Sequence, residues 1–260
     1  MSIRIAIEQL AAFAEAPFEG NPAAVCCLDA WLPDPLMQAI ATENNLSETA
    51  FLIGSRGRYQ LRWFTPACEV DLCGHATLAA ADVVYRREPE QHTLQFESRS
   101  GTLRVQREGD RITLDFPVQR AHPCLPPAGL QEAIGATPQS CLLGVDLIAV
   151  FADEDTIRTL RPNPELVAAL PGRGLIATAP GQHVDVVSRF FAPGCGIPED
   201  PVTGSAHCSL TPYWCETLGK TVLNARQLSA RGGSLRCRLQ GERVLITGRV
   251  IPYLSGSIQV

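Results

Sequence analysis

The stretch EVDLCGHATLAAADVVY, residues 69 to 85, places a cysteine, a glycine and a histidine at the beginning of an apolar segment. From Gly74 onward the segment carries small and apolar residues on nearly every face, which predicts a helix buried on all sides. Such a helix has unpaired backbone N–H groups and a partial positive charge at its first turn. The segment around Cys73, Gly74 and His75 is therefore either a simple turn or a site for an anionic ligand.

A related stretch recurs in the second half of the chain. RWFTPACEVDLCGHA occupies residues 62 to 76, and RFFAPGCGIPEDPVTGSA occupies residues 189 to 206. Four residues recur 127 positions later: Arg62, Phe64, Pro66 and Cys68 as Arg189, Phe191, Pro193 and Cys195. After a three-residue insertion, three more recur 130 positions later: Glu69, Gly74 and Ala76 as Glu199, Gly204 and Ala206. The repeat predicts two homologous halves, each with a buried helix that begins at a glycine.

Short segments typical of strands surround both predicted helices. In the first half they are RIAIEQL, AAVCCL, TAFLIG, YQLRWF, HTLQFES, GTLRVQRE and RITLDFPV; in the second half they are DLIAVFA, GLIATAP, HVDVVSRFF, SLRCRLQG and RVLITGRVI. Further helices are expected at about residues 35–44, 129–134 and 154–169. This order predicts an α+β fold in which strands surround one buried helix, twice. The proline-rich stretch FPVQRAHPCLPPAG, residues 116 to 129, predicts the linker, which gives lobes of residues 1–118 and 119–260.

Composition narrows the classes of partner. A net charge of -5 argues against nucleic acid and anionic membranes as partners. The sequence has no run of about 18 apolar residues, which argues against a membrane-spanning helix. The first residues, MSIRIAIEQLAAFAEAPF, lack the basic leader of a secretory signal, so we expect a cytoplasmic protein.

Ten cysteines raise the question of disulfides or a metal. None forms a C-x-x-C pair, and the five histidines do not lie at metal-binding spacings from them. We expect reduced, mostly buried thiols and no metal site. The sequence has neither the G-x-G-x-x-G motif nor a Walker loop, so we expect no cofactor.

Four motifs carry a resemblance to a known family. They are GNPAAV (20 to 25), ENNLSETAF (43 to 51), TPACEVDLCGHATLAAA (65 to 81) and EDPVTGSAHC (199 to 208). In this order they strongly resemble the PhzF-like phenazine-biosynthesis isomerase family, which has the wider diaminopimelate epimerase-like fold, and the resemblance covers essentially the whole chain. It implies two pseudo-symmetric lobes, each a mostly antiparallel β-barrel around a central α-helix, with the C-terminal strand (about 248–260) returning to the first lobe. It also implies cofactor-independent acid/base chemistry in a cleft between the lobes, and a homodimer.

Glu48 is the residue that the resemblance assigns as the catalytic acid/base, because it is the glutamate of the N-L-S-E motif. The residues around it agree. Glu48 begins a strand that continues TAFLIG, and the strand phase groups it with Leu46, Ala50 and Leu52 on an apolar face. A carboxyl group that is partly desolvated there can take and return a proton near neutral pH. The alternative is a solvated acid at a strand end.

The starts of the two helices supply the other candidate residues. His75 and Asp200 stand where the family has polar pocket residues, so both join Glu48 as catalytic candidates. The substrate-binding candidates share a place at a helix start or in a motif: Gly74, Gly204, Ser205, Cys73, Thr203 and Asn21. The alternatives are a helix-capping role for His75 and Asp200. His207 lies inside the second helix and is expected to be a core histidine.

Cys73 separates two branches of the fold. Epimerase and racemase relatives use two cysteines, one immediately before each glycine, whereas here Cys73 is matched by Thr203. A threonine hydroxyl is too weak a base to exchange a proton alone at neutral pH, so two-cysteine racemisation is not expected. Cys73 is expected to line the pocket, and a one-base role with another group stays open.

Three functions are compatible with these observations. The leading hypothesis is an isomerase of the PhzF-like type, which moves a proton on a small carboxylate-bearing substrate by carboxyl acid/base catalysis. The second is a racemase or epimerase of an amino-acid-like substrate that uses Glu48 or Cys73. The third is a non-catalytic binding protein on the same scaffold.

Overall fold

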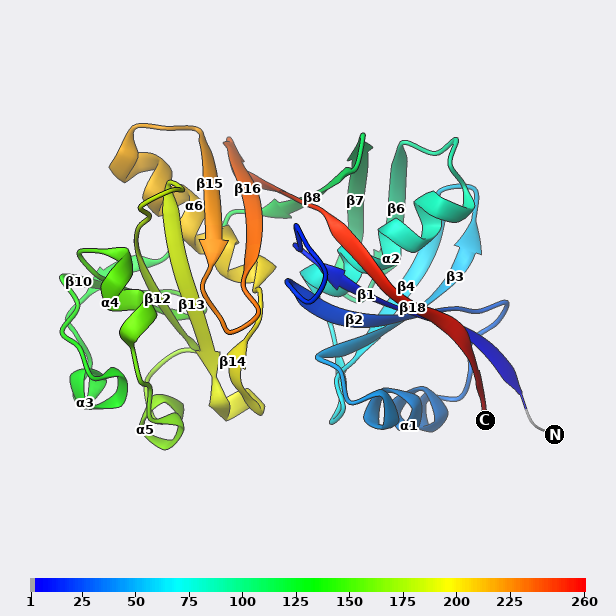
Figure 1. The fold of residues 1–260 in the computed structure, drawn as a ribbon, viewed down its shortest axis with the longest axis horizontal. Helices are drawn as coiled ribbons and strands as arrows, with labels where there is room; N and C mark the ends of the chain where they lie inside the picture. Colours follow the sequence, from blue (N-terminus) through cyan, green and yellow to red (C-terminus); the bar gives the residue numbers. More distant parts are fainter. Residues whose placement is uncertain (1–2) are drawn as a thin grey trace. The chain divides into compact units, whose positions relative to one another are not determined.

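Strands make up most of the regular structure in residues 3–260, the part of the chain that this computed structural model describes (Figure 1). Few helices accompany them, so the protein is a sheet-rich α+β protein. Contacts divide the chain into two units, which we call the first unit (residues up to Asp115, with Thr247–Val260) and the second unit (Phe116–Ile246). No helix within residues 3–260 is long and apolar enough to cross a membrane.

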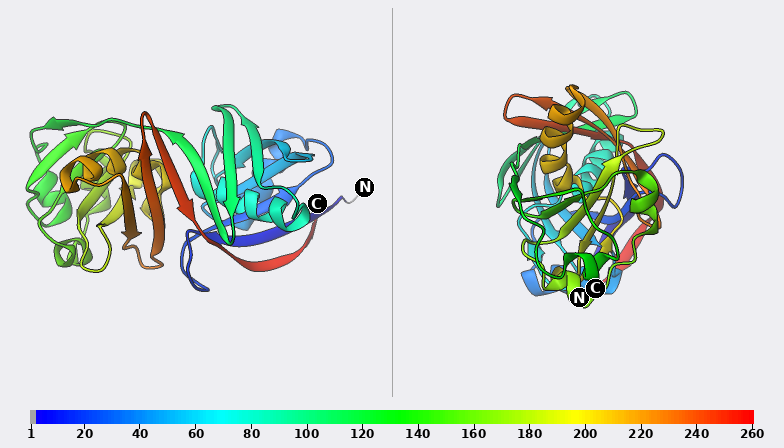
Figure 2. Two further views of the ribbon diagram at one scale, coloured as in Figure 1. Left: turned by 90° about the horizontal axis from the view of Figure 1, so that it is seen from above. Right: turned by 90° about the vertical axis from the view of Figure 1, so that its left-hand side faces the viewer.

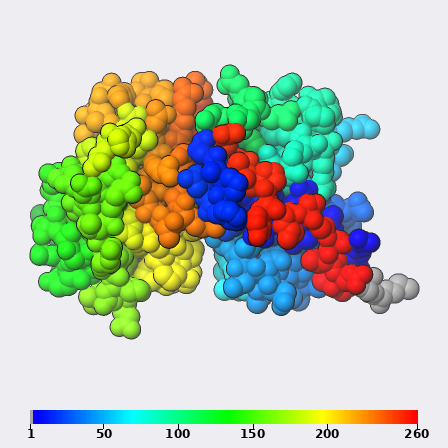
Figure 3. Space-filling view, in the orientation of Figure 1, coloured from blue at the N-terminus to red at the C-terminus, as the bar shows by residue number. Residues whose placement is uncertain are grey.

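The first unit contains two long helices and most of the strands expected from the first half. Its elements are β1 (Arg4–Ala12), β2 (Asn21–Cys27), α1 (Asp34–Asn44), β3 (Glu48–Ser55), β4 (Arg58–Phe64), β5 (Glu69–Val70), α2 (Gly74–Arg87), β6 (Thr93–Ser98), β7 (Gly101–Glu108), most of β8 (Arg111–Pro117) and β18 (Val250–Gln259). β2 and β3 run parallel, and β3 and β4 run antiparallel. The last strand, β18, lies antiparallel to β1, so the blue and red ends of the chain share one surface in Figure 3.

Helix α2 is the buried helix of the first unit. It contacts β1, β2 and β3, and ten of its residues are buried, from His75 to Tyr85. Figure 2 shows the ribbon from two further sides in the colours of Figure 1. Cys73 precedes it in an extended conformation, and its carbonyl accepts a hydrogen bond from the Thr77 hydroxyl. Because apolar residues occupy nearly every face, the helix cannot turn one face to water, and the strands around it bury it.

The second unit contains β9 to β17 and the second buried helix. Its elements are β9 (His122–Cys124), α3 (Leu130–Ile134), β10 (Ser140–Leu143), β11 (Leu147–Val150), α4 (Glu154–Thr159), α5 (Pro164–Ala168), β12 (Leu175–Pro180), β13 (Val186–Ala192), the 3₁₀ turn η1 (Pro193–Cys195), β14 (Ile197–Asp200), α6 (Gly204–Leu218), β15 (Val222–Gln227), β16 (Gly233–Gln240) and most of β17 (Arg243–Gly248). β11 and β12 run parallel, and β12 and β13 antiparallel, as β2, β3 and β4 do in the first unit. Helix α6 contacts β15 and β16 and has nine buried residues.

Three expected elements differ from the structure. The helix expected at 154–169 is two short helices, α4 and α5, because Pro162 disfavours helix at the residue before it and the Asn163 side chain caps α5. The expected linker 116–129 includes β9, whose backbone pairs with β10. The strand expected over RVLITGRVI is two strands, β17 and β18, divided at Arg249. Beside the division, Gly248 packs so closely against the Phe13 ring that a Cβ there would lie 2.3 Å from it.

Candidate functional site

Glu48 and His75 meet in the first unit. Glu48 is the first residue of β3, where the parallel ladder sets it opposite Ala23 of β2. His75 is the second residue of α2. Both residues are buried, and Glu48 Oε2 lies 2.9 Å from His75 Nε2. Within residues 3–260 neither of these two buried atoms has a further hydrogen-bond partner, so each is the other's polar contact.

Cys73 completes a row of three side chains. Its Sγ lies 3.5 Å from Nδ1 of His75, on the opposite side of the imidazole from Glu48. The imidazole therefore bridges a thiol and a carboxylate. The alternative that His75 is a helix-cap residue bonded to backbone does not fit, because both ring nitrogens contact side chains.

The electrostatics of this row favour a charged imidazole and a neutral thiol. Burial lowers the pKa of His75, but Cys73 and Glu48 raise it, and the pKa lies well above its usual 6.5. Burial and the Glu48 carboxylate raise the pKa of Cys73 to about 11, against a smaller lowering by His75. At neutral pH Cys73 is thus a thiol, and the Glu48 carboxylate is the charge that keeps His75 protonated.

The same three side chains could hold a metal ion by distance alone. One donor atom each from Glu48, Cys73 and His75 lies within 4.8 Å of the others. A metal would require Cys73 and His75 to lose their protons, and both pKa values lie above their ordinary values. Metal binding at these residues would therefore release protons and would strengthen as the pH rises.

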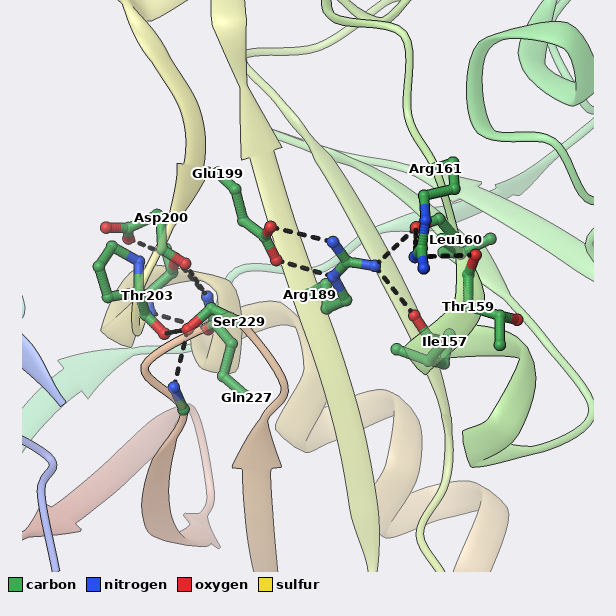
Figure 4. Close-up of polar contacts among 12 residues, drawn as sticks. Ile157, Thr159, Leu160, Arg161, Arg189, Glu199, Asp200, Thr203, Gln227 and Ser229 are labelled. Atoms are coloured by element: carbon green, nitrogen blue, oxygen red, sulfur yellow. Dashed lines mark hydrogen bonds and ion pairs between the residues drawn. The ribbon is translucent and has the colours of Figure 1, made fainter. Parts of the chain in front are cut away.

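The second unit has a hydrogen-bonded polar group before its buried helix, shown in Figure 4. The Thr203 hydroxyl donates a short hydrogen bond to Asp200 Oδ2. Gln227 of β15 then links the two residues: its Nε2 donates to the Asp200 carbonyl at 2.7 Å, and its Oε1 accepts from the Thr203 N–H at 2.8 Å. Asp200 is therefore fixed by Thr203 and Gln227, and Thr203 is the N-cap residue of α6.

Ser205, the second residue of α6, contacts an arginine. Arg173 Nη2 lies 3.1 Å from Ser205 Oγ, while the same guanidinium holds the buried Asp146 at 3.0 Å (Nε to Oδ1) and 2.7 Å (Nη2 to Oδ2). Gly204 begins α6, as Gly74 begins α2. The start of α6 thus offers hydrogen-bond donors, where the start of α2 offers a carboxylate–imidazole pair.

An arginine–glutamate pair supports each helix start. Arg62 binds Glu69 with its Nε and Nη2, both at 2.7 Å, and its guanidinium lies over the Phe64 ring. In the second unit Arg189 binds Glu199 in the same way, at 2.7 and 2.9 Å, over Phe191. Figure 4 shows that the Arg189 guanidinium also donates to the carbonyls of Ile157 and Leu160. These are the arginines and glutamates that recur along the sequence.

The structure brings most of the predicted site residues together in two groups. Glu48, Cys73 and His75 contact one another in the first unit, and Asp200 and Thr203 do so in the second. Asn21 is fully buried at the start of β2. His207 is a core residue, as expected, and its Nδ1 bonds the Thr203 carbonyl at 2.9 Å.

Two residues of these groups, Gln227 and Arg173, are not predicted from the sequence. Gln227 lies 24 positions after Thr203, on another strand, and no motif marks it. Arg173 stands between two glycines in PGRG, a weak signal for a side chain held by a constrained backbone.

The ten cysteines are all free. Six are buried, two are half-buried, and Cys68 and Cys195 are exposed. Burial raises the pKa of several buried thiols, that of Cys26 to about 12, with a smaller contribution from Cys27. Such thiols behave as small hydrophobic side chains.

Comparisons with known proteins agree over nearly the whole chain. Residues 10–256 match a family model described as phenazine biosynthesis-like protein. An uncharacterized isomerase of Pseudomonas aeruginosa is 52% identical over 259 residues, which cover 99% of this chain and 100% of the relative. The crystal structure of a PhzF-family protein from Enterococcus faecalis has a TM-score of 0.97 at 44% identity and covers 99% of this chain and 100% of that chain. A predicted epimerase of P. aeruginosa shares the fold, with a TM-score of 0.77 at 21% identity over 98% and 99% of the two chains.

Proposed function

Because the chain belongs to the phenazine biosynthesis-like family, we propose that it is an isomerase that moves a proton on a small carboxylate-bearing substrate, with Glu48 as the acid/base. Its curated relatives are named isomerases, and isomerase activity as such follows from the family. The observation that supports the finer proposal is the 2.9 Å contact between Glu48 and His75, because it places a carboxyl group and an imidazole side by side in a buried position.

In the proposed reaction, the Glu48 carboxylate removes a proton from a carbon next to a conjugated system. The C–H bond breaks, its electron pair enters the conjugated system, and an O–H bond forms on Glu48. Glu48 then returns the proton to another carbon of the same molecule, so the substrate and the product have the same atoms. His75 fixes the orientation of Glu48 through Oε2, and in this proposal Oε1 is the oxygen that takes and returns the proton.

We also propose that the two units are pseudo-symmetric lobes, each a β-barrel around its helix, and that they derive from one duplicated unit. The shared order of parallel and antiparallel pairs, β2–β3–β4 and β11–β12–β13, supports this proposal. The shared arginine–glutamate pairs support it as well.

A second candidate is an epimerase, which needs a proton acceptor on one side of the reacting carbon and a proton donor on the other. The 3.5 Å contact of Cys73 with His75 is the observation in its favour, because it links a thiol to the same imidazole. The raised pKa of Cys73, about 11, opposes it. Inversion at a stereocentre with uptake of solvent deuterium would support the epimerase.

The proposal is tested by a metabolite screen in deuterium oxide, read by mass spectrometry. The wild-type protein should introduce deuterium into one or more small carboxylates, and Glu48→Gln should not. Arg120→Gln is a matched control, because Arg120 forms an exposed ion pair with Glu242 at the surface of the second unit. Deuterium uptake that is equal in wild-type protein and Glu48→Gln would disprove the proposed role of Glu48.

A further inference from the structure

Arg173 is fixed by a buried carboxylate, yet much of its side chain stays exposed. The Asp146 side chain is fully buried, whereas the Arg173 side chain is 41% exposed. Two hydrogen bonds to Asp146 and one to Ser205 fix the plane of the guanidinium. Because a bidentate pair sets the orientation of both groups, the exposed edge of Arg173 has a defined direction before any ligand binds.

The backbone around Arg173 is equally constrained. Gly172 has φ +95°, and a Cβ there would lie 2.9 Å from the Leu147 nitrogen. A Cβ on Gly174 would lie 2.8 Å from the Phe190 ring, and the Arg173 guanidinium lies 5.4 Å from the centre of the same ring. Arg173 also borders a cavity of about 220 Å³, so there is open space beside it.

The strand register identifies the position in the first unit that is equivalent to the segment around Arg173. Thr49 pairs with Phe64 in the first unit, and Leu175 pairs with Phe191, the counterpart of Phe64, in the second. The residue before each is Glu48 in one unit and Gly174 in the other.

Ser205 is in turn the counterpart of His75, each being the second residue of its helix. The second unit therefore has Arg173 and Ser205 near the position where the first unit has Glu48 and His75. The carboxylate bonded to Arg173, that of Asp146, is fully buried, whereas the arginine side chain is 41% exposed.

We propose that Arg173 and Ser205 bind a carboxylate group of the substrate, and that Arg173 is the residue that selects carboxylates over their neutral amides. The arginine supplies charge and the two N–H groups of Nη1, because its Nε and Nη2 hydrogens bond Asp146 and Ser205. Ser205, which accepts from Arg173, keeps its own O–H to donate. If Arg173 served only to neutralise Asp146, its guanidinium would need neither its exposure nor its contact with Ser205. The inference rests on the proposed function only in taking this ligand to be the substrate.

Binding of simple probes tests the inference apart from catalysis. Acetate, succinate and benzoate, and their primary amides, would be titrated at millimolar concentration into wild-type protein and Glu48→Gln. The Nε–Hε signals of the arginines would be followed by NMR. One or more of the carboxylates should shift the Arg173 signal equally in both proteins, and the amides should not.

Substitutions at the site must allow for Asp146. Arg173→Gln alone would leave a buried carboxylate unpaired and would endanger folding. The double variant Asp146→Asn/Arg173→Gln keeps a neutral hydrogen-bonded pair and should bind the carboxylates about 10- to 100-fold more weakly, as expected for loss of a charge-assisted bond. Arg173→Lys, which keeps the charge without the fork, should fall between the two.

Three results would overturn the inference. They are a wild-type protein that binds none of the three carboxylates, a protein that binds the amides equally well, and a double variant that binds as tightly as Arg120→Gln. Each is independent of the deuterium screen. If Glu48→Gln still exchanged deuterium while Arg173 bound carboxylates, the proposed role of Glu48 would fail and the binding site would stand.

Discussion

The starts of α2 and α6 are alike in scaffold and different in chemistry. Each follows an extended residue, begins at a glycine and stands beside an arginine–glutamate pair over a phenylalanine ring. In the first unit the next side chains are a carboxylate and an imidazole in contact, and in the second they are a serine and an arginine.

The difference shows where the chain has kept its symmetry and where it has lost it. The repeated pairs Arg62–Glu69 and Arg189–Glu199 are ion pairs that hold a strand to the segment before the helix. The positions that differ, Glu48 against Gly174 among them, are those that would meet a ligand. This difference fits our two proposals, in which the first unit transfers a proton and the second unit binds a carboxylate.

The largest expected effect concerns the repeated ion pairs. Arg189→Met removes the partner of a partly buried glutamate and should lower the free energy of unfolding by about 3 kcal/mol. Arg62→Met should cost less, because Glu69 keeps a second partner, Arg99, at 2.7 Å. Urea denaturation of both variants measures the difference. If Arg62→Met were the more destabilising change, the two pairs would not be equivalent supports.

A loss of stability of similar size toward acid pH should arise in the second helix. His207 stands where α2 has Thr77, and burial lowers the pKa of His207 to about 4, against a smaller raising by its bond to the Thr203 carbonyl. The unfolded chain, with a pKa near 6.5, binds this proton more readily than the folded chain. The contribution of neutral His207 to the free energy of unfolding should therefore be fully present above pH 6.5. The free energy should fall by about 3 kcal/mol as the pH drops from 6.5 to 4.

The variant His207→Thr gives α6 the residue that α2 has at the equivalent position, Thr77. It should be less stable at all pH values because the smaller side chain leaves a cavity. Its free energy of unfolding should, however, fall less steeply between pH 6.5 and 4, because the contribution of His207 is gone. Urea midpoints measured across that range report both effects. An unchanged slope would show that His207 does not titrate as its burial requires.

The glycine at the position of Glu48 should not tolerate a side chain. In Gly174→Ala the new Cβ would lie 2.8 Å from the Phe190 ring and from the Phe191 carbonyl oxygen, so the expected loss is about 1–3 kcal/mol. Gly194→Ala is the matched control, since nothing lies within 4 Å of its Cβ position, and it should change stability by less than about 0.5 kcal/mol. Equal thermal midpoints for the two variants would contradict the packing around Gly174.

The smallest effect is expected at Cys73. Its raised pKa, about 11, leaves it a neutral thiol at pH 7, so Cys73→Ala should lower turnover by less than about tenfold. Steady-state rates at pH 7 measure this, with Cys26→Ala as a control for loss of a buried thiol. A loss as large as that of Glu48→Gln would move the protein to the thiol branch of the fold.

Local patterns in the sequence predict the framework well. The apolar faces of residues 74–87 and 204–218 predict α2 and α6. Arg62 and Glu69 recur in the sequence as Arg189 and Glu199, and the structure shows that each arginine binds its glutamate. Glu48, His75 and Cys73 are predicted by motif, and their contacts follow from β3 and α2 packing together.

The sequence does not predict residues that act across distant strands. Gln227 and Arg173 reach the start of α6 from β15 and from the loop before β12, and only the tertiary packing brings them there. The break between α4 and α5 is a similar case, because the apolar pattern runs through residues 154–169 while Pro162 and Asn163 interrupt the backbone.

The most direct test of the account is the turnover of Glu48→Gln on a substrate identified by deuterium uptake, measured together with its affinity for that substrate. Glutamine keeps the shape of the side chain and removes the proton-transfer group. The account predicts that kcat falls by about two to four orders of magnitude while the dissociation constant changes little. A Glu48→Gln variant that retains its turnover, beside a Cys73→Ala variant that has lost it, would contradict the assignment of the proton transfer to Glu48.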